Sequence, residues 1–242
     1  MFLLTSILGC GRNNPEIITD PPVVIDKIFP INEYLLTVPE PSGIAYNSVN
    51  NSFMVVSDGR PDIYEINFTG ITINTIPASG SDMEGIALSK NCDTIYVVEE
   101  QKRIVTLFNL SGTKLKSFPA DVATVDNNAL EGITIKKTSN QLFVINEKNP
   151  RMILGFNGSA EIWRKTIDYT LDISDIYYED STNCFWIISD ESKKILKLSS
   201  TGDFVKEWEI PFLKGEGITI VNDKIYIVND LDGKLYVFQK PN

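Results

Sequence analysis

A short phrase that recurs at a nearly constant interval constrains this chain more than any other feature of its sequence. The phrase reads Met-Glu-Gly-Ile-Ala-Leu at residues 83–88 and returns at 130–135 and 215–220, with weaker copies at 41–46 and 173–178. The aligned positions 43, 85, 132, 175 and 217 are separated by 42, 47, 43 and 42 residues. A self-similar period of this length indicates an array of stacked or radial repeats.

A second phrase follows each copy of the first and ends in an acidic residue. Its five copies end at Asp58, Glu100, Glu147, Asp190 and Asp230. Two linked phrases that recur five times are much harder to obtain by chance than one phrase alone. The pair therefore predicts five similar structural units.

Each unit contains short segments rich in β-branched residues and separated by turn residues. In the second unit these segments are 85–88, 94–98, 104–109 and 114–118. Four antiparallel strands in each repeat are typical of a β-propeller blade, and no segment has the spacing of an amphipathic helix. The sequence therefore predicts an all-β fold, a five-bladed β-propeller.

The last unit provides only three strands before the chain ends, at residues 217–221, 224–228 and 234–238. A ring left open there would have unpaired strand edges, which proteins avoid. Strand-like sequence near residues 23–37 can supply the missing outer strand. We therefore expect one propeller domain over residues 23–242, with its last blade closed by an N-terminal strand.

The first 22 residues are typical of a targeting segment followed by a tether. Residues 1–9 form an apolar run too short to span a bilayer, and Ile7-Leu8-Gly9-Cys10 is similar to the cleavage box of bacterial lipoproteins. Residues 11–22 are dense in Pro and Asn, as flexible tethers are. We expect a signal remnant over residues 1–10 and a cell-envelope lipoprotein whose only membrane contact is the lipid on Cys10. An ordinary N-terminus is the alternative.

Composition excludes several classes of chemistry. The formal net charge of −10 disfavours a nucleic-acid partner, because phosphate backbones repel acidic chains. The absence of histidine removes the usual general base of a Ser-His-Asp site and the common ligands of zinc and iron. Three cysteines without a Cys-x-x-Cys pair indicate neither a disulfide framework nor a zinc site.

Several stretches resemble the bacterial SdiA-regulated family. They are the Glu-Gly-Ile repeats, Asn-Glu-Lys-Asn-Pro at residues 146–150 and Ser-Asp-Glu-Ser at residues 189–192. The resemblance covers about residues 35–240. It implies a five-bladed propeller distantly similar to NHL-repeat proteins, with a bound calcium and no established reaction.

The two phrases are expected to surround one mouth of the central channel. The first opens the innermost strand of each blade and the second ends the antiparallel neighbour, so both lie at the same end. Clustered carboxylates raise each other's pKa, recruit a cation or pair with basic residues. Ligands that are all oxygen suit calcium or magnesium, and calcium accepts an irregular shell of six to eight oxygens. We expect a calcium ion held by Glu131 and Glu147, with help from Glu84, Asp190 or Glu216.

Salt bridges are the alternative to a cation. Basic residues follow the acidic phrases, at Arg60, Lys102, Arg103, Lys148, Arg151, Lys193, Lys194 and Lys234. A ring of solvated ion pairs from these residues would neutralise most of the charge without a metal.

Two functions therefore remain open. One is a monomeric, non-enzymatic binding module of the cell envelope, whose partner is an unidentified small molecule or envelope protein. The other is a metal-dependent hydrolase similar to lactonases, esterases or phosphoesterases, in which a channel calcium polarises a carbonyl or phosphoryl oxygen. Such an enzyme needs a carboxylate base, and Glu84, Glu131 or Glu216 could serve. The hydrolase rests on analogy of fold, and no catalytic residue is assigned.

Overall fold

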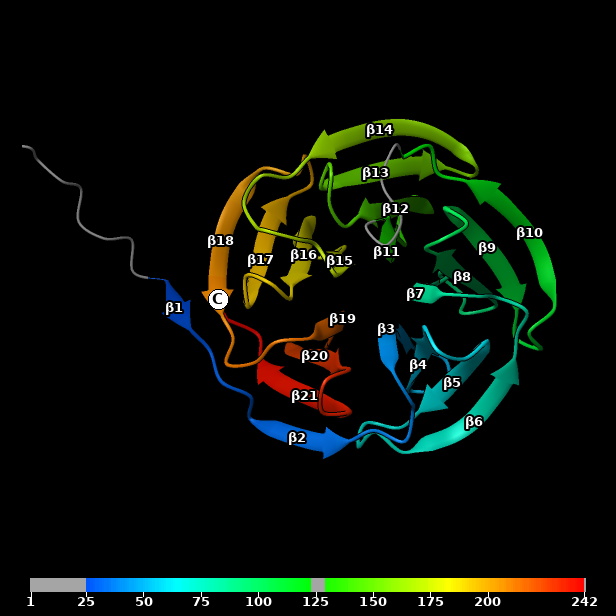
Figure 1. Ribbon diagram of the computed structural model, residues 1–242, viewed down its shortest axis with the longest axis horizontal. Coiled ribbons are helices and arrows are strands. Elements are labelled where there is room, and N and C mark those ends of the chain that lie inside the picture. Colours follow the sequence, from blue (N-terminus) through cyan, green and yellow to red (C-terminus); the bar gives the residue numbers. More distant parts are fainter. Residues whose placement is uncertain (1–24, 123–128, 242) are drawn as a thin grey trace, which may run out of the picture.

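The computed structural model describes residues 25–122 and 129–241, and within them every regular element is a β-strand (Figure 1). Twenty-one strands form five sheets arranged in a ring around a central axis (Figure 1). The five-bladed β-propeller predicted from the repeats is confirmed. The residues of the signal remnant and tether, Cys10 among them, lie outside the described residues.

The first three blades each consist of four consecutive antiparallel strands, with the first strand innermost. Blade 1 contains β3 (Pro41–Asn47), β4 (Ser52–Ser57), β5 (Asp62–Ile66) and β6 (Thr72–Pro77). Blade 2 contains β7 (Met83–Leu88), β8 (Thr94–Glu99), β9 (Ile104–Asn109) and β10 (Lys114–Pro119). Blade 3 contains β11 (Leu130–Lys136), β12 (Gln141–Asn146), β13 (Met152–Asn157) and β14 (Ala160–Thr166).

The last two blades also use strands from the N-terminal segment (Figure 1). Blade 4 contains β15 (Asp175–Glu179), β16 (Cys184–Ser189), β17 (Lys194–Ser199), β18 (Phe204–Glu209) and, outermost, β1 (Asp26–Lys27). Blade 5 contains β19 (Gly215–Val221), β20 (Lys224–Asn229), β21 (Lys234–Gln239) and β2 (Asn32–Leu35). The antiparallel pair of β2 with β21 closes the ring, as the sequence predicts.

The sequence did not predict the pairing of β1 with blade 4. Asp26 and Lys27 run parallel to Trp208 and Glu209 of β18, and the Lys27 ammonium lies 2.8 Å from the Glu209 carboxylate. Both residues of β1 are exposed, so no alternation of apolar and polar positions marks the strand. The N-terminal segment thus joins the outer edges of two blades.

The hydrophobic core lies between adjacent blades. Trp186 and Trp208 of blade 4 stack with ring centroids 5.3 Å apart and belong to one cluster with Phe238 of blade 5. The ring centroids of Phe53 in blade 1 and Tyr226 in blade 5 are 4.7 Å apart, so the first and last blades also share a core. Burial of apolar surface between the blades, aromatic and aliphatic, favours ring closure.

The inner strands approach most closely at one column of residues: Gly43, Gly85, Gly132, Asp175 and Gly217. A Cβ atom on Gly85 would lie 2.6 Å from the carbonyl oxygen of Glu131 and 2.7 Å from the Cα of Gly132. Adjacent blades therefore meet backbone to backbone, and only glycine fits this approach.

Asp175 replaces glycine in the fourth blade and contacts both neighbouring blades. Its Oδ2 accepts a hydrogen bond of 2.8 Å from the backbone N–H of Ile218 in blade 5, and its Oδ1 occupies the space that a side chain on Gly132 of blade 3 would need. The residue is 1% exposed, and Oδ1 has no hydrogen-bond partner within the described residues. Burial raises the pKa of Asp175 well above its usual range, although backbone amides oppose the rise.

Cys92 is buried and Cys184 half-buried, and both are free thiols. The described residues include no helix of the length and apolar character needed to cross a membrane.

Gly85→Ala tests the close contact between inner strands. The new Cβ would meet backbone atoms of blade 3, so the two blades would have to separate. Overpacking of a tight site costs about 1–3 kcal/mol, and we expect a loss at the upper end in the free energy of unfolding, measured by urea denaturation. Gly155→Ala is the control, because its Cβ would meet only side-chain atoms at 3.3 Å. Equal losses in the two variants would contradict the account.

Candidate functional site at the acidic channel mouth

Three glutamates occupy β-bulges in the inner strands. The register of β7 against β8 shifts between Met83 and Gly85, which makes Glu84 the extra residue. Similar shifts fall at Glu131 in β11 and at Glu216 in β19. A bulge interrupts the ladder and redirects a side chain, and bulges are frequent beside functional sites. The recurring Glu-Gly pair thus places a carboxylate at the same level of three blades.

Backbone hydrogen bonds join the strand-end acids to the residues just before the inner strands. The N–H of Glu100 donates to the carbonyl of Asp82 at 3.0 Å, and that of Asp230 donates to the carbonyl of Lys214 at 3.2 Å. Glu147 makes the equivalent bond to Ala129 at 2.8 Å. The two repeated phrases therefore meet at one end of each of these blades, as antiparallel pairing predicts.

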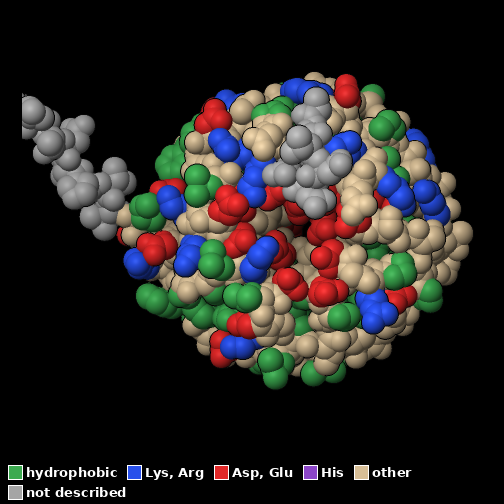
Figure 2. All heavy atoms as spheres, in the orientation of Figure 1, with side chains coloured by type: hydrophobic (Ala, Val, Ile, Leu, Met, Phe, Trp, Pro, Cys, Tyr) green, Lys and Arg blue, Asp and Glu red, His purple; other side chains and the backbone are tan. Residues whose placement is uncertain are grey.

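These residues surround a cavity of about 190 Å³ at the channel mouth. Its lining consists of Glu40, Pro41, Ser42, Asp58, Glu84, Glu131, Lys214, Glu216 and Asp230. Six carboxylates thus face one lysine, and Figure 2 shows the acidic side chains gathered around the central hollow. The electrostatic potential of this mouth is strongly negative, which favours cations.

Three of the five metal ligands predicted from the sequence line this cavity: Glu84, Glu131 and Glu216. The other two lie outside its lining and are held by lysines. The Glu147 carboxylate lies 2.7 Å from the Lys148 ammonium. The Asp190 carboxylate accepts the backbone N–H of Lys214 and lies 3.5 Å from the ammonium of the same residue.

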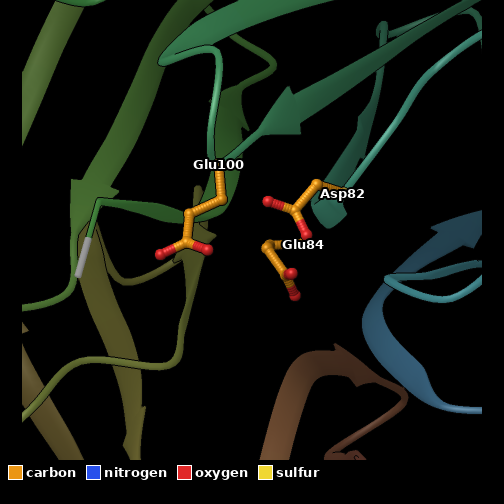
Figure 3. Close-up of side chains that lie close together, drawn as sticks. All are labelled: Asp82, Glu84 and Glu100. Atoms are coloured by element: carbon orange, nitrogen blue, oxygen red, sulfur yellow. The ribbon is translucent and has the colours of Figure 1, made fainter. Parts of the chain in front are cut away.

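The tightest group of carboxylates is Asp82, Glu84 and Glu100 (Figure 3). One carboxylate oxygen from each lies within 4.8 Å of the others. Asp82 also accepts the backbone N–H of Gln101, and Glu100 that of Ala129, each at 3.1 Å. These backbone bonds fix two of the three carboxylates, while Glu84 lies between them without such a bond.

Glu100 is one of the strand-end acids of the second repeated phrase, whereas Asp82 lies outside both repeated phrases and was not predicted from the sequence. Asp82 lies three residues before Gly85, and the equivalent residues in blades 1 and 5 are Glu40 and Lys214. All three adopt left-handed backbone conformations, with φ of 55°, 44° and 60° respectively. A third aligned column at this position would have revealed Asp82.

Burial and mutual repulsion raise the pKa values of the inner glutamates. Burial first, and then the carboxylates of Asp58 and Asp82, raise the pKa of Glu84 to about 9. Burial followed by Glu84 raises the pKa of Glu131 well above its usual range. Burial also raises the pKa of Glu216, but only to about 7, because the Lys214 ammonium offsets part of the effect.

Ion pairs neutralise only part of the mouth. Lys148 pairs with Glu147 and Glu191, whereas Lys102 pairs with the buried Glu99 and Lys234 pairs with Glu33 on the outer strand. Within the described residues, the carboxylates of Glu84 and Glu131, which line the cavity, have neither a hydrogen bond nor an ion pair. Lys214 pairs with Glu216 at 3.3 Å, so among the inner glutamates the ion pairs leave Glu84 and Glu131 uncompensated.

Comparison with known proteins supports the architecture. A family model described as SdiA-regulated matches residues 36–242. A solved structure of a nidogen/laminin complex is similar, with a TM-score of 0.57 and 15% identity over 78% of this chain and 72% of the other. The β-propeller domain of Cps50 (Swd1) from Myceliophteria thermophila has a TM-score of 0.51 and 8% identity over 82% of this chain and 65% of that one. Sequence identities this low support a similarity of fold only.

The raised pKa of Glu84 predicts that the metal-free protein loses stability as the pH rises. The pKa of Glu84 is about 9 in the folded state, against an ordinary value of 4.5. The free energy of unfolding is therefore highest below pH 4.5, where the carboxyl is protonated in both states, and it falls as the pH rises toward about 9. We expect the melting temperature, measured with a chelator present, to fall over this range. Glu84→Gln should flatten the dependence, because an amide does not ionise.

Glu33→Gln is the matched control for this experiment. Glu33 lies on the exposed outer strand β2, and its ion pair with Lys234 has little effect on stability. This variant changes the net charge equally but should keep the pH dependence of the wild type. If Glu84→Gln retains the full pH dependence, the repulsion attributed to Glu84 is wrong.

Proposed function

The chain belongs to the SdiA-regulated family, and we propose that it is a non-enzymatic binding module whose acidic channel mouth holds a calcium-class cation. One observation carries the proposal: Glu84 and Glu131 line a cavity rich in carboxylates and have no partner within the described residues. Uncompensated carboxylates held this close are costly unless they bind protons or a cation.

The donor set favours calcium over other common metals. Asp82, Glu84 and Glu100 offer only carboxylate oxygens, and Glu131 and Glu216 lie in the adjoining cavity wall. Calcium accepts six to eight oxygen ligands in irregular geometry, whereas magnesium demands a near-ideal octahedron. The proposed site centres on blade 2, because Lys148 already neutralises Glu147 in blade 3.

A second candidate function, a metal-dependent hydrolase, is favoured by one specific observation. Glu131 lies unpaired in the cavity with a raised pKa, near the group formed by Asp82, Glu84 and Glu100. A carboxylate beside a cation but outside its ligand shell can accept a proton from water. Calcium-dependent turnover of lactones, aryl esters or phosphate esters that is lost in Glu131→Gln would favour the hydrolase, and uniform inactivity would favour the binding module.

We further propose that the module is an envelope lipoprotein attached through Cys10. The described chain enters the propeller at β1, on the outer edge of blade 4 (Figure 1). Fifteen residues lie between Cys10 and Asp26, and an extended chain over these residues reaches at most ~58 Å. Attachment at the rim of the ring would leave both channel mouths accessible to a small molecule or an envelope protein.

Calcium should raise the melting temperature of the purified protein, and a chelator should reverse the effect. A ligand that binds only the folded state at a hundredfold excess over its dissociation constant adds about 2.7 kcal/mol. For a domain of this size that corresponds to roughly 5–11 °C in the melting temperature. Glu84→Gln and Glu131→Gln should reduce the response, because an amide keeps the shape of the side chain but loses its charge.

Glu33→Gln again serves as the control and should respond to calcium as the wild type does. If neither calcium nor the chelator changes the melting temperature at low ionic strength, the proposed cation site is wrong. The same result would remove the basis for the hydrolase, which needs the metal to activate water.

Cys10→Ala should release the protein from the membrane fraction into the soluble fraction of a bacterial host. Several acyl chains anchor a protein stably in a membrane, and the variant would lack the cysteine that carries them. Fractionation followed by immunoblotting measures the distribution. Ser6→Ala, in the same segment, should leave it unchanged. Unchanged fractionation of Cys10→Ala would refute the lipid anchor.

A further inference from the structure

Residues 28–36, which we call the strap, run along the outer rim of blades 4 and 5 and include β2 (Figure 1). Backbone hydrogen bonds fix the strap to both blades. The N–H of Ile28 donates to the carbonyl of Glu209 in blade 4 at 3.0 Å, and that of Ile31 donates to Val237 in blade 5 at 2.7 Å. From residue 32 to residue 35 the strap pairs with β21. Its side chains therefore have fixed directions.

Apolar residues occupy both sides of the strap. On the inner side, three residues are half-buried and pack against the hydrophobic core: Ile28, Tyr34 and Leu36. On the outer side, three residues are 66%, 49% and 71% exposed: Phe29, Ile31 and Leu35. A strand with one face on the core and the other in water normally carries polar residues on the outer face. The fold alone therefore does not account for the outer three.

The strap differs in this respect from other outer strands. Strand β10 also exposes an apolar residue, Leu115, but between Lys114 and Lys116, which are exposed as well. The outer side of the strap has one charged residue, Glu33, and its carboxylate lies 3.2 Å from the Lys234 ammonium. Single exposed apolar side chains are ordinary, whereas neighbouring ones mark a site of interaction.

The charges beside the strap are paired with one another. The Lys27 ammonium lies 2.8 Å from the Glu209 carboxylate, and the Lys206 ammonium lies 3.3 Å from that of Asp26. The acidic mouth lies at the centre of the ring, away from the rim, and Figure 2 shows hydrophobic side chains along the lower left edge, where the strap runs. The strap can therefore meet an anionic surface although the chain carries a net charge of −10.

The place of the strap in the chain determines which surface it meets. It follows β1 directly, and fifteen residues lie between Asp26 and Cys10, the proposed site of the lipid. A tether of that length keeps the strap within ~58 Å of the bilayer. Tethering turns binding into an intramolecular event with a high effective concentration, so a small apolar surface with weak affinity of its own suffices.

We propose that the strap docks on the lipid bilayer through Phe29, Ile31 and Leu35. This inference rests on the lipid anchor proposed for Cys10. The three side chains enter the boundary between headgroups and acyl chains, as the apolar faces of interfacial segments do. Because the strap lies on the rim, the ring stands edge-on to the membrane, and both ends of the channel open along the membrane surface.

Photocrosslinking in bacterial membranes tests this docking in the full chain. p-Benzoyl-phenylalanine replaces Phe29 or, as a control, Leu115 of β10 on the opposite side of the ring (Figure 1). We expect about tenfold more phospholipid adduct at position 29 than at position 115, measured by mass spectrometry, because only the strap enters the bilayer. The proposal is overturned if position 29 yields no such excess of lipid adduct, whether or not it crosslinks to a protein.

Vesicle flotation tests the strap without the lipid anchor. The purified full chain with Cys10→Ala is mixed with vesicles of phosphatidylethanolamine and phosphatidylglycerol. Adding the three changes Phe29→Ser, Ile31→Ser and Leu35→Ser should lower the partition coefficient about tenfold, because apolar area no longer leaves water. The control carries three changes of exposed apolar residues elsewhere and should partition as its parent does: Leu110→Ser, Leu115→Ser and Ile162→Ser.

These chains all retain residues 1–9, so any binding through that segment is common to them. Unchanged thermal unfolding verifies that each variant folds. An unchanged partition coefficient in the strap variant, or an equal loss in the control, would refute docking through the strap. Neither result bears on the lipid anchor, which the fractionation of Cys10→Ala tests separately.

Discussion

Direct backbone contact between the inner strands is the feature on which the rest of this propeller depends. Four glycines and Asp175 form the column at which the blades meet, and a methyl group on Gly85 would already collide with the backbone of blade 3. This contact lies between the residues that line a cavity at one end of the channel and those that line a cavity at the other end. It also fixes the inner strands at a common level, so equivalent residues of different blades must lie together.

The two cavities differ in how their charges are satisfied. Beside the glycine column, bulges bring Glu84, Glu131 and Glu216 into one cavity, and only Glu216 has a lysine partner within the described residues. At the opposite end, the Lys240 ammonium lies between the carboxylates of Glu179 and Asp223. Repulsion among the carboxylates of the acidic mouth favours a cation there.

Much of this arrangement could be predicted from the sequence because it repeats. The spacing of the phrases gave the number of blades, and the missing strand of the last blade predicted its closure by an N-terminal strand. The convergence of Glu84, Glu131 and Glu216 followed from their equivalent positions.

Other features depend on contacts between residues that the repeat does not relate. Strand β1 has two residues, both exposed, and therefore shows no alternation of apolar and polar positions. Asp82 immediately precedes Met83, at which the aligned phrase begins. The ion pair of Glu147 with Lys148 depends on side-chain direction, which spacing alone does not determine.

Calorimetric titration with calcium in two buffers of different ionisation enthalpy is the most direct test of the cation site. Binding requires ionised carboxylates, so protons held by the crowded mouth must leave when the cation enters. Because the pKa values of Glu84 and Glu131 are both raised, the account predicts saturable binding near pH 7.5 that is accompanied by proton release. Binding without proton release, or no binding at all, would contradict it.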